Sequence, residues 1–158
     1  CAVTHGERFA FQQDMNGHAE LHFFRTPGFM GAGLKPMLRV NGNDISGIAR
    51  GGYVTVLLDP GVHVIELVDN KNDGATWTSR ENIRFEVSLS NSDQKAYEFV
   101  IKSFWVLPIP IGVPGVILPV AGGRNSVLLE KPVSEVLVDL NSLKGSRIDL
   151  RKQRASTF

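Results

Sequence analysis

The sequence predicts an all-β protein, built as an antiparallel β-sandwich of the immunoglobulin or transthyretin kind. Three observations lead to this fold class. Between residues 19 and 102, short apolar or alternating segments follow one another at close spacing. Recognisable turns such as Asn41-Gly42 and Asp59-Pro60-Gly61 separate these segments. No long helical pattern interrupts the series, and this combination is typical of two packed sheets.

The first expected strands lie between residues 19 and 48. Residues 19–25 are rich in apolar and aromatic side chains, and a glycine-rich loop follows at 26–33. Residues 36–40 form a short strand that ends at Asn41-Gly42, a pair typical of a type I′ hairpin turn because both residues accept positive φ. The return strand covers residues 44–48.

Four more strands are expected before residue 103. Residues 53–58 are apolar almost throughout, and the turn at 59–61 connects them to a partner strand at 62–68. A polar loop at 69–82 comes next. The two segments after this loop, 83–89 and 95–102, alternate between apolar and polar residues, which predicts strands with one face in the core. The expected inward-facing residues are Ile83, Phe85, Val87, Leu89, Tyr97, Phe99 and Ile101.

Residues 103–123 contain no charged side chain. Their length and apolar character suit a membrane span. However, four prolines interrupt them, and a membrane helix must satisfy its own backbone hydrogen bonds. We therefore expect an extended or polyproline-like arm, which docks onto a partner protein. The residues expected to bind that partner are Phe104, Trp105, Pro108, Pro110 and Pro114.

A short amphipathic helix is expected at residues 132–143. Apolar residues recur there at i, i+3, i+4 and i+7, and the segment ends near Gly145. This helix would pack on a sheet edge, and a strand at 135–140 is the alternative. The apolar positions are Val133, Val136, Leu137 and Leu140.

We expect three regions in the chain: a tether at 1–18, the sandwich with its arm at 19–143, and a basic tail at 144–158. The tether is polar and has no sustained period. The tail has five basic residues against one acidic residue, and it should be mobile unless a partner or an anionic lipid surface orders it.

Composition and motifs provide no sign of catalysis. The 158 residues carry a formal net charge of +1, with 42% hydrophobic and 21% charged side chains, which favours no nucleic-acid partner. The glycines at 28–33 have neither the order nor the following helix of a phosphate-binding loop. His18 and His22 would stand about 13 Å apart along a strand, too far for one metal. No nucleophile elbow is present. We expect no enzyme activity, no metal and no cofactor other than a covalent lipid.

Several motifs between residues 19 and 67 resemble a bacterial lipoprotein family known as domain of unknown function 2846. The hairpin and Pro-Gly-x-His motifs are also similar to those of PEGA repeats. The resemblance implies a lipid-anchored envelope domain without an established catalytic activity. It rests on Phe23-Phe24-Arg25, Gly31, Val40-Asn41-Gly42, Gly52-Tyr53 and Pro60-Gly61-Val62-His63.

Cys1, the only cysteine, is at the position where a mature bacterial lipoprotein carries its lipid after signal-peptide cleavage. A single cysteine excludes an intrachain disulfide and a cysteine-based zinc site. We expect Cys1 to carry acyl chains such as palmitate and to anchor the protein to a membrane. Ala2 rather than Asp follows, which favours the outer membrane, with the domain facing the periplasm or the cell surface.

These features predict a non-enzymatic accessory subunit of a larger envelope assembly, such as a secretion, flagellar or pilus machine. An uncovered apolar arm needs a neighbour, because free monomers rarely expose large apolar patches. The alternative is a binding module for a glycan, peptidoglycan or a small ligand, with Trp77 in the 69–82 loop as its contact residue.

Overall fold

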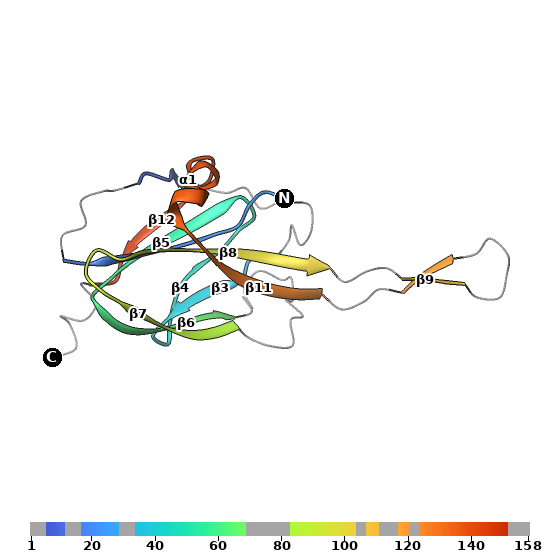
Figure 1. The fold of residues 1–158 in the computed structure, drawn as a ribbon, viewed down its shortest axis with the longest axis horizontal. Helices are drawn as coiled ribbons and strands as arrows, with labels where there is room; N and C mark the ends of the chain where they lie inside the picture. The colour runs from blue at the N-terminus through green and yellow to red at the C-terminus, as the bar shows by residue number, and fades with distance from the viewer. Residues whose placement is uncertain are drawn as a thin grey trace.

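Two facing sheets and one short helix make up the body of the protein (Figure 1). The structure is a computed structural model that describes residues 6–11, 17–28, 34–68, 83–103, 107–110, 117–120 and 124–151, with the backbone alone between 102 and 126. The elements are β1 (Glu7–Arg8), β2 (Ala19–Phe24), β3 (Met37–Val40), β4 (Asn43–Gly47), β5 (Gly52–Leu58), β6 (Gly61–Val68), β7 (Ile83–Leu89), β8 (Gln94–Ser103), β9 (Leu107–Pro110), β10 (Ile117–Val120), β11 (Arg124–Lys131), α1 (Val133–Asn141) and β12 (Lys144–Asp149).

The larger sheet has the strand order β1-β12-β5-β2-β8-β11, and the smaller sheet has the order β4-β3-β6-β7. The smaller sheet is antiparallel, as expected. The larger sheet is not purely antiparallel, because β2 pairs with β8 and β5 pairs with β12 in parallel. Both parallel pairs need long connections. In the sequence, the strands of the smaller sheet come between β2 and β8, and α1 comes between β11 and β12.

One hydrophobic core fills the space between the sheets. Alternate residues of β2, β5 and β8 enter it from the larger sheet, and alternate residues of β3, β6 and β7 enter it from the smaller one. The alternation expected for 83–89 and 95–102 is confirmed, since Ile83, Phe85, Val87, Leu89, Tyr97, Phe99 and Ile101 all belong to or contact this core.

A second cluster packs between α1 and the outer face of the larger sheet. Figure 1 shows the helix on the side of that sheet away from β3, β6 and β7. The helix is confirmed and the alternative strand at 135–140 is wrong. Pro132 precedes the first turn with a φ of −57°, an angle suited to helix entry. Val136 and Leu140 are buried, while Val133 and Leu137 are partly buried. The helix covers the face of the sheet rather than its edge, because Phe24 and Ala96 provide the apolar surface there.

The expected hairpin turn at Asn41-Gly42 is confirmed. Asn41 has a φ of 49° and Gly42 a φ of 83°, the positive values that a type I′ turn requires at both positions. The turn joins β3 to β4, and a bulge between Leu38 and Arg39 shifts their register.

Two segments placed outside the sandwich by the sequence are part of it. The expected basic tail begins with β12, and residues 144–149 pair in parallel with β5 from Gly52 to Leu57. The expected tether contains β1, which pairs with Lys144 and Gly145 of β12. Phe9 follows β1 and is buried in the second cluster. Residues of both regions that were expected to lie outside the domain therefore belong to the larger sheet.

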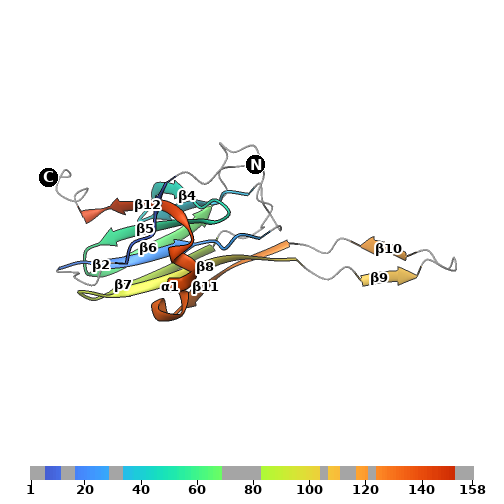
Figure 2. The ribbon, with the colours of Figure 1, turned by 90° about the horizontal axis from the view of Figure 1, so that it is seen from above.

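The described part of the 103–123 arm has extended strands, but they pair with each other as a β-hairpin and do not form a single unpaired or polyproline-like segment. β8 continues to Ser103 and pairs from Ala96 to Ser103 with β11, a strand that the sequence did not predict. β9 and β10 then form a separate antiparallel ribbon. Figures 1 and 2 show this ribbon beyond the ends of β8 and β11, away from the two sheets and α1.

Candidate functional site

Polar side chains line the outer face of β2, the strand at the middle of the larger sheet. Ala19, Leu21 and Phe23 face the main core, so strand alternation turns Glu20 and His22 to the opposite side. His18 precedes the strand. All three polar residues are buried. We call His18, Glu20 and His22 the buried polar row.

The register of the sheet brings partners to this row from β5 and β12. Thr55 lies between His22 on one side and Arg147 on the other, and the histidine Nδ1 is 2.9 Å from the Thr55 hydroxyl. The Arg147 guanidinium forms an ion pair with the Glu20 carboxylate. The sheet thus places a compensating cation beside its buried carboxylate, which would be costly to bury alone.

A second set of contacts extends the buried polar row toward the end of β12. The His18 Nε2 is 3.4 Å from the Glu20 carboxylate, and the His18 Nδ1 is 3.2 Å from the Arg151 guanidinium. Arg151 donates two further hydrogen bonds to Asp149, at 2.9 and 2.7 Å. The network therefore links the start of β2 to the end of β12 across the intervening β5.

His22 remains neutral at ordinary pH. Burial is the larger cause that lowers its pKa from 6.5 to about 4, and the nearby Arg147 charge is the smaller one, while the Gln94 side chain acts in the opposite direction. Its Nε2 is 3.8 Å from the Glu20 Oε2, and neither atom has a hydrogen-bond partner in the described part of the chain. Phe9 closes the site with an edge-on ring contact to His22. These contacts account for the buried imidazole through its neighbours on the sheet.

The remaining described histidine, His63, connects two turns. Its Nε2 donates to the Asp59 carbonyl oxygen at 2.7 Å, because a carbonyl can only accept. Its Nδ1 therefore accepts from the Asn41 side-chain amide at 2.9 Å. The Asn41 Oδ1 in turn accepts from the Val64 backbone N–H. These contacts explain the Asn-Gly and Pro-Gly-x-His motifs as one structural unit.

Arg25, from the Phe-Phe-Arg motif, has a comparable structural place. It is buried, donates to the Leu34 carbonyl at 2.7 Å, and its guanidinium carbon lies 5.8 Å from the centre of the Phe99 ring. Burial lowers the pKa of its guanidinium. The arginine thus holds Leu34, the residue after the glycine loop, against the sandwich.

Only part of the expected partner-binding set falls among the described residues. Pro108 and Pro110 lie on β9, and Pro108 is opposite Pro119 of β10. The described parts of the chain contain no group of three His, Cys, Asp or Glu side chains able to hold a metal, and no helix among them is long and apolar enough to cross a membrane. The expected site residues that lie outside the described residues are Cys1, Trp77, Phe104, Trp105 and Pro114.

The pairing of β9 with β10 is compatible with prolines at these positions. Opposite residues in an antiparallel pair alternate between those that exchange hydrogen bonds and those that do not. Pro108 and Pro119 both lack an N–H, so they form a pair that exchanges none, and Pro110 falls in the same alternation. The prolines therefore lie where an N–H would point away from the partner strand, and they remove donors from the outer edges of the ribbon.

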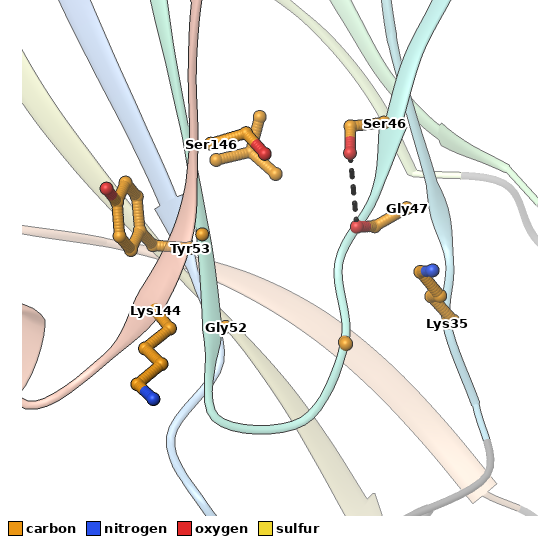
Figure 3. Close-up of a pocket in the computed structure, with 10 residues that line it drawn as sticks. Lys35, Ser46, Gly47, Gly52, Tyr53, Lys144 and Ser146 are labelled. Atoms are coloured by element: carbon orange, nitrogen blue, oxygen red, sulfur yellow. Dashed lines mark hydrogen bonds between the residues drawn. The ribbon is translucent and has the colours of Figure 1, made fainter. Parts of the chain in front are cut away.

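A pocket of about 200 Å³ lies between the two sheets (Figure 3). The starts of β5 and β12 form one wall, and the end of β4 forms the other together with Lys35, which lies two residues before β3. Lys144 and Ser146 line it from the larger sheet, and Lys35 and Ser46 line it from the smaller sheet. Sequence reasoning missed this pocket. Its residues come from separate segments whose approach depends on the unexpected pairing of β12 with β5.

Comparison with known proteins adds no relative. A scan against protein-family models found no match for this chain, and a search of curated proteins found none either. The resemblance to the bacterial lipoprotein family therefore stays a prediction, and the function has to be argued from the molecule itself.

Proposed function

We propose that the protein is a non-enzymatic accessory subunit of a larger cell-envelope assembly and that it docks through the hairpin formed by β9 and β10. One observation carries the proposal: this ribbon lies outside the sandwich, and the 103–123 segment that contains it has no charged residue. An isolated two-stranded ribbon is marginally stable in water, and apolar surface of this kind is generally covered in a working assembly. A partner protein would cover the apolar surface and stabilise the ribbon.

The prolines favour one mode of contact with that partner. Pro108, Pro110 and Pro119 leave the outer edges of the ribbon without several N–H donors. Another strand could not pair regularly along such an edge, because the ladder needs those donors. The partner would therefore receive the ribbon in an apolar groove by side-chain packing, and not by adding a strand.

The buried polar side chains support the non-enzymatic part of the proposal. His22, His63 and Glu20 are all buried, and they contact side chains and carbonyl groups of neighbouring strands and turns. These contacts account for the burial of the polar side chains without a catalytic role. The envelope location rests on the predicted lipid at Cys1 and on the lipoprotein resemblance.

Within the two-sheet architecture we also propose an immunoglobulin- or transthyretin-like arrangement. Its support is the core between the sheets, to which alternate residues of both inner faces contribute. The parallel pairs β2–β8 and β5–β12 distinguish this chain from a purely antiparallel member of that class.

A hairpin deletion tests the docking proposal. Ser103 and Arg124 are directly paired at the ends of β8 and β11, so an Asn-Gly turn can replace residues 104–123 and close the hairpin there. We expect this variant to fold with an unchanged unfolding temperature, and to lose the proteins that co-purify with the full chain from detergent-solubilised membranes. The intact mass of the extracted protein tests the lipid on Cys1 in the same sample.

The matched control removes an exposed apolar side chain from the sandwich itself. Val138 on α1 is 80% exposed, so Val138→Ser should change neither folding nor co-purification. If the chain without the hairpin kept the same co-purifying proteins as the full chain, docking through this ribbon would be refuted.

A further inference from the structure

The pocket between the sheets has a cationic lining. Lys35 and Lys144 stand on opposite walls, as Figure 3 shows, and the described residues that line the pocket include no Asp or Glu. Neither ammonium group forms an ion pair in the part of the chain that the structure describes. The adjoining β1 adds one charge of each sign, since Arg8 is opposite Lys144 and Glu7 is opposite Gly145. The pocket therefore has an excess of positive charge.

Glycines give this pocket its shape. A Cβ at Gly47 would come within 2.8 Å of the Lys35 side-chain carbons, so the absence of a side chain there lets the lysine stem lie across the end of β4. A Cβ at Gly145 would come within 1.8 Å of the Tyr53 carbonyl oxygen. Gly145 thus allows β12 to approach β5 closely, and this approach brings Lys144 and Ser146 to the rim.

The volume limits what the pocket can hold. The pocket measures about 200 Å³. Pockets for drug-sized ligands are larger, about 300 Å³ or more. The space suits a small ion or the head of a larger molecule, and it does not suit a glycan chain.

We propose that this pocket binds a small oxyanion of the phosphate class, held between the Lys35 and Lys144 ammonium groups with hydrogen bonds from the Ser46 and Ser146 hydroxyls. Lysine binds phosphate as a mobile point charge, and its flexible stem lets two lysines on opposite walls turn toward one anion. The same chemistry fits free phosphate or a phosphate monoester at the end of a small molecule.

The test is a titration of the full chain, labelled with ¹⁵N, by inorganic phosphate and separately by glycerol 3-phosphate at constant ionic strength. We expect saturable shifts of the backbone amides of Gly47, Gly52 and Gly145, which line the pocket. Lys35→Gln and Lys144→Gln should each weaken binding about tenfold, the usual effect of losing one charged hydrogen-bond partner. Tighter binding of glycerol 3-phosphate would identify the ligand as a monoester, and equal or weaker binding would identify free phosphate.

Two further variants separate a site from general charge attraction. Lys95→Gln removes the same charge from β8, where Lys95 pairs with Glu130 at 3.7 Å, and it should leave the affinity unchanged. Gly47→Ala keeps the charge but displaces the Lys35 stem, so it should weaken binding as Lys35→Gln does. Shifts that do not saturate, an equal loss in Lys95→Gln, or equal affinity for acetate would each overturn the proposal.

Discussion

A single histidine in the centre of the larger sheet makes stability depend on pH. His22 is 1% exposed, and its imidazole lies between Thr55 and the ring of Phe9, with the Arg147 charge nearby. Protonating it would place a cation in a buried site that already contains the arginine. The neighbouring Glu20 offers little relief, because its carboxylate is already paired with Arg147.

The sign of this pH dependence follows from the lowered pKa. His22 has a pKa of about 4 in the folded protein against 6.5 as its ordinary value. Between these values the unfolded chain binds more protons, so the stabilisation is complete above about pH 6.5 and is lost as the pH falls toward 4. At about 1.4 kcal/mol per pH unit, the free energy of unfolding should fall by about 3 kcal/mol over this window. Urea unfolding across the window measures it.

The control for this prediction is His22→Gln, which keeps a polar side chain that does not titrate. Carboxylates also contribute to the slope at low pH, so the difference between the two proteins isolates the histidine. We expect the variant to show a slope smaller by about one proton near pH 5. Identical slopes would mean that His22 is protonated without penalty.

At the scale of elements, β12 depends on a close approach that glycine alone permits. Gly145 pairs with Tyr53, and a Cβ there would overlap the Tyr53 carbonyl oxygen at 1.8 Å. Since both atoms are backbone or fixed to it, the strands would have to separate. We expect Gly145→Ala to lower the free energy of unfolding by about 3 kcal/mol, the upper range for overpacking. Chemical denaturation measures the loss. The neighbouring exposed Ser146→Ala should cost little, and equal stability of the two variants would contradict the pairing.

The sequence could predict the elements whose side chains alternate strongly. β7 and β8 have apolar residues at every second position, and Asn41-Gly42 has turn chemistry that depends on two residues alone. β12 offered no such signal. Its sequence, KGSRID, has one large apolar residue, Ile148, and its strand conformation comes from pairing with β5 and from the contact of Arg147 with Glu20. Such long-range pairing cannot be derived from a local pattern.

The candidate sites show the same limit. The sequence shows Glu20 and His22 as polar residues within the apolar β2 segment. Their burial could not be predicted from it, because it depends on the cover that α1, Phe9 and β12 give to the outer face. The pocket is even harder to predict from the sequence. Lys35 and Lys144 are more than a hundred residues apart, and the register of two sheets is needed to place them on facing walls.

At the scale of the whole molecule, the larger sheet joins the two ends of the described chain. β1 and Phe9 come from the first residues, β12 comes from the last, and both contribute to the face that α1 covers. Arg151 and Leu150 extend this closure, since the Leu150 N–H donates to the Leu57 carbonyl oxygen. The folding unit is therefore wider than the expected 19–143 sandwich.

Two truncations test this wider folding unit. A chain that ends at Leu143 lacks β12, so Glu20 loses Arg147, β1 loses its partner, and β5 keeps β2 as its one neighbour. Loss of Arg147 leaves the buried Glu20 carboxylate without this cation. Removing one partner of a fully buried ion pair costs about 3–5 kcal/mol, which is an upper bound for this pair because the Arg147 side chain is 28% exposed, against a total stability of about 5–15 kcal/mol for a typical domain. We expect this chain to be unfolded or to melt far below the full chain by circular dichroism. A chain that ends at Arg151 keeps every contact described here and should melt with the full chain. If the chain that ends at Leu143 had the same melting temperature as the full chain, β12 would not be needed for folding, and the domain boundary expected at residue 143 would be correct.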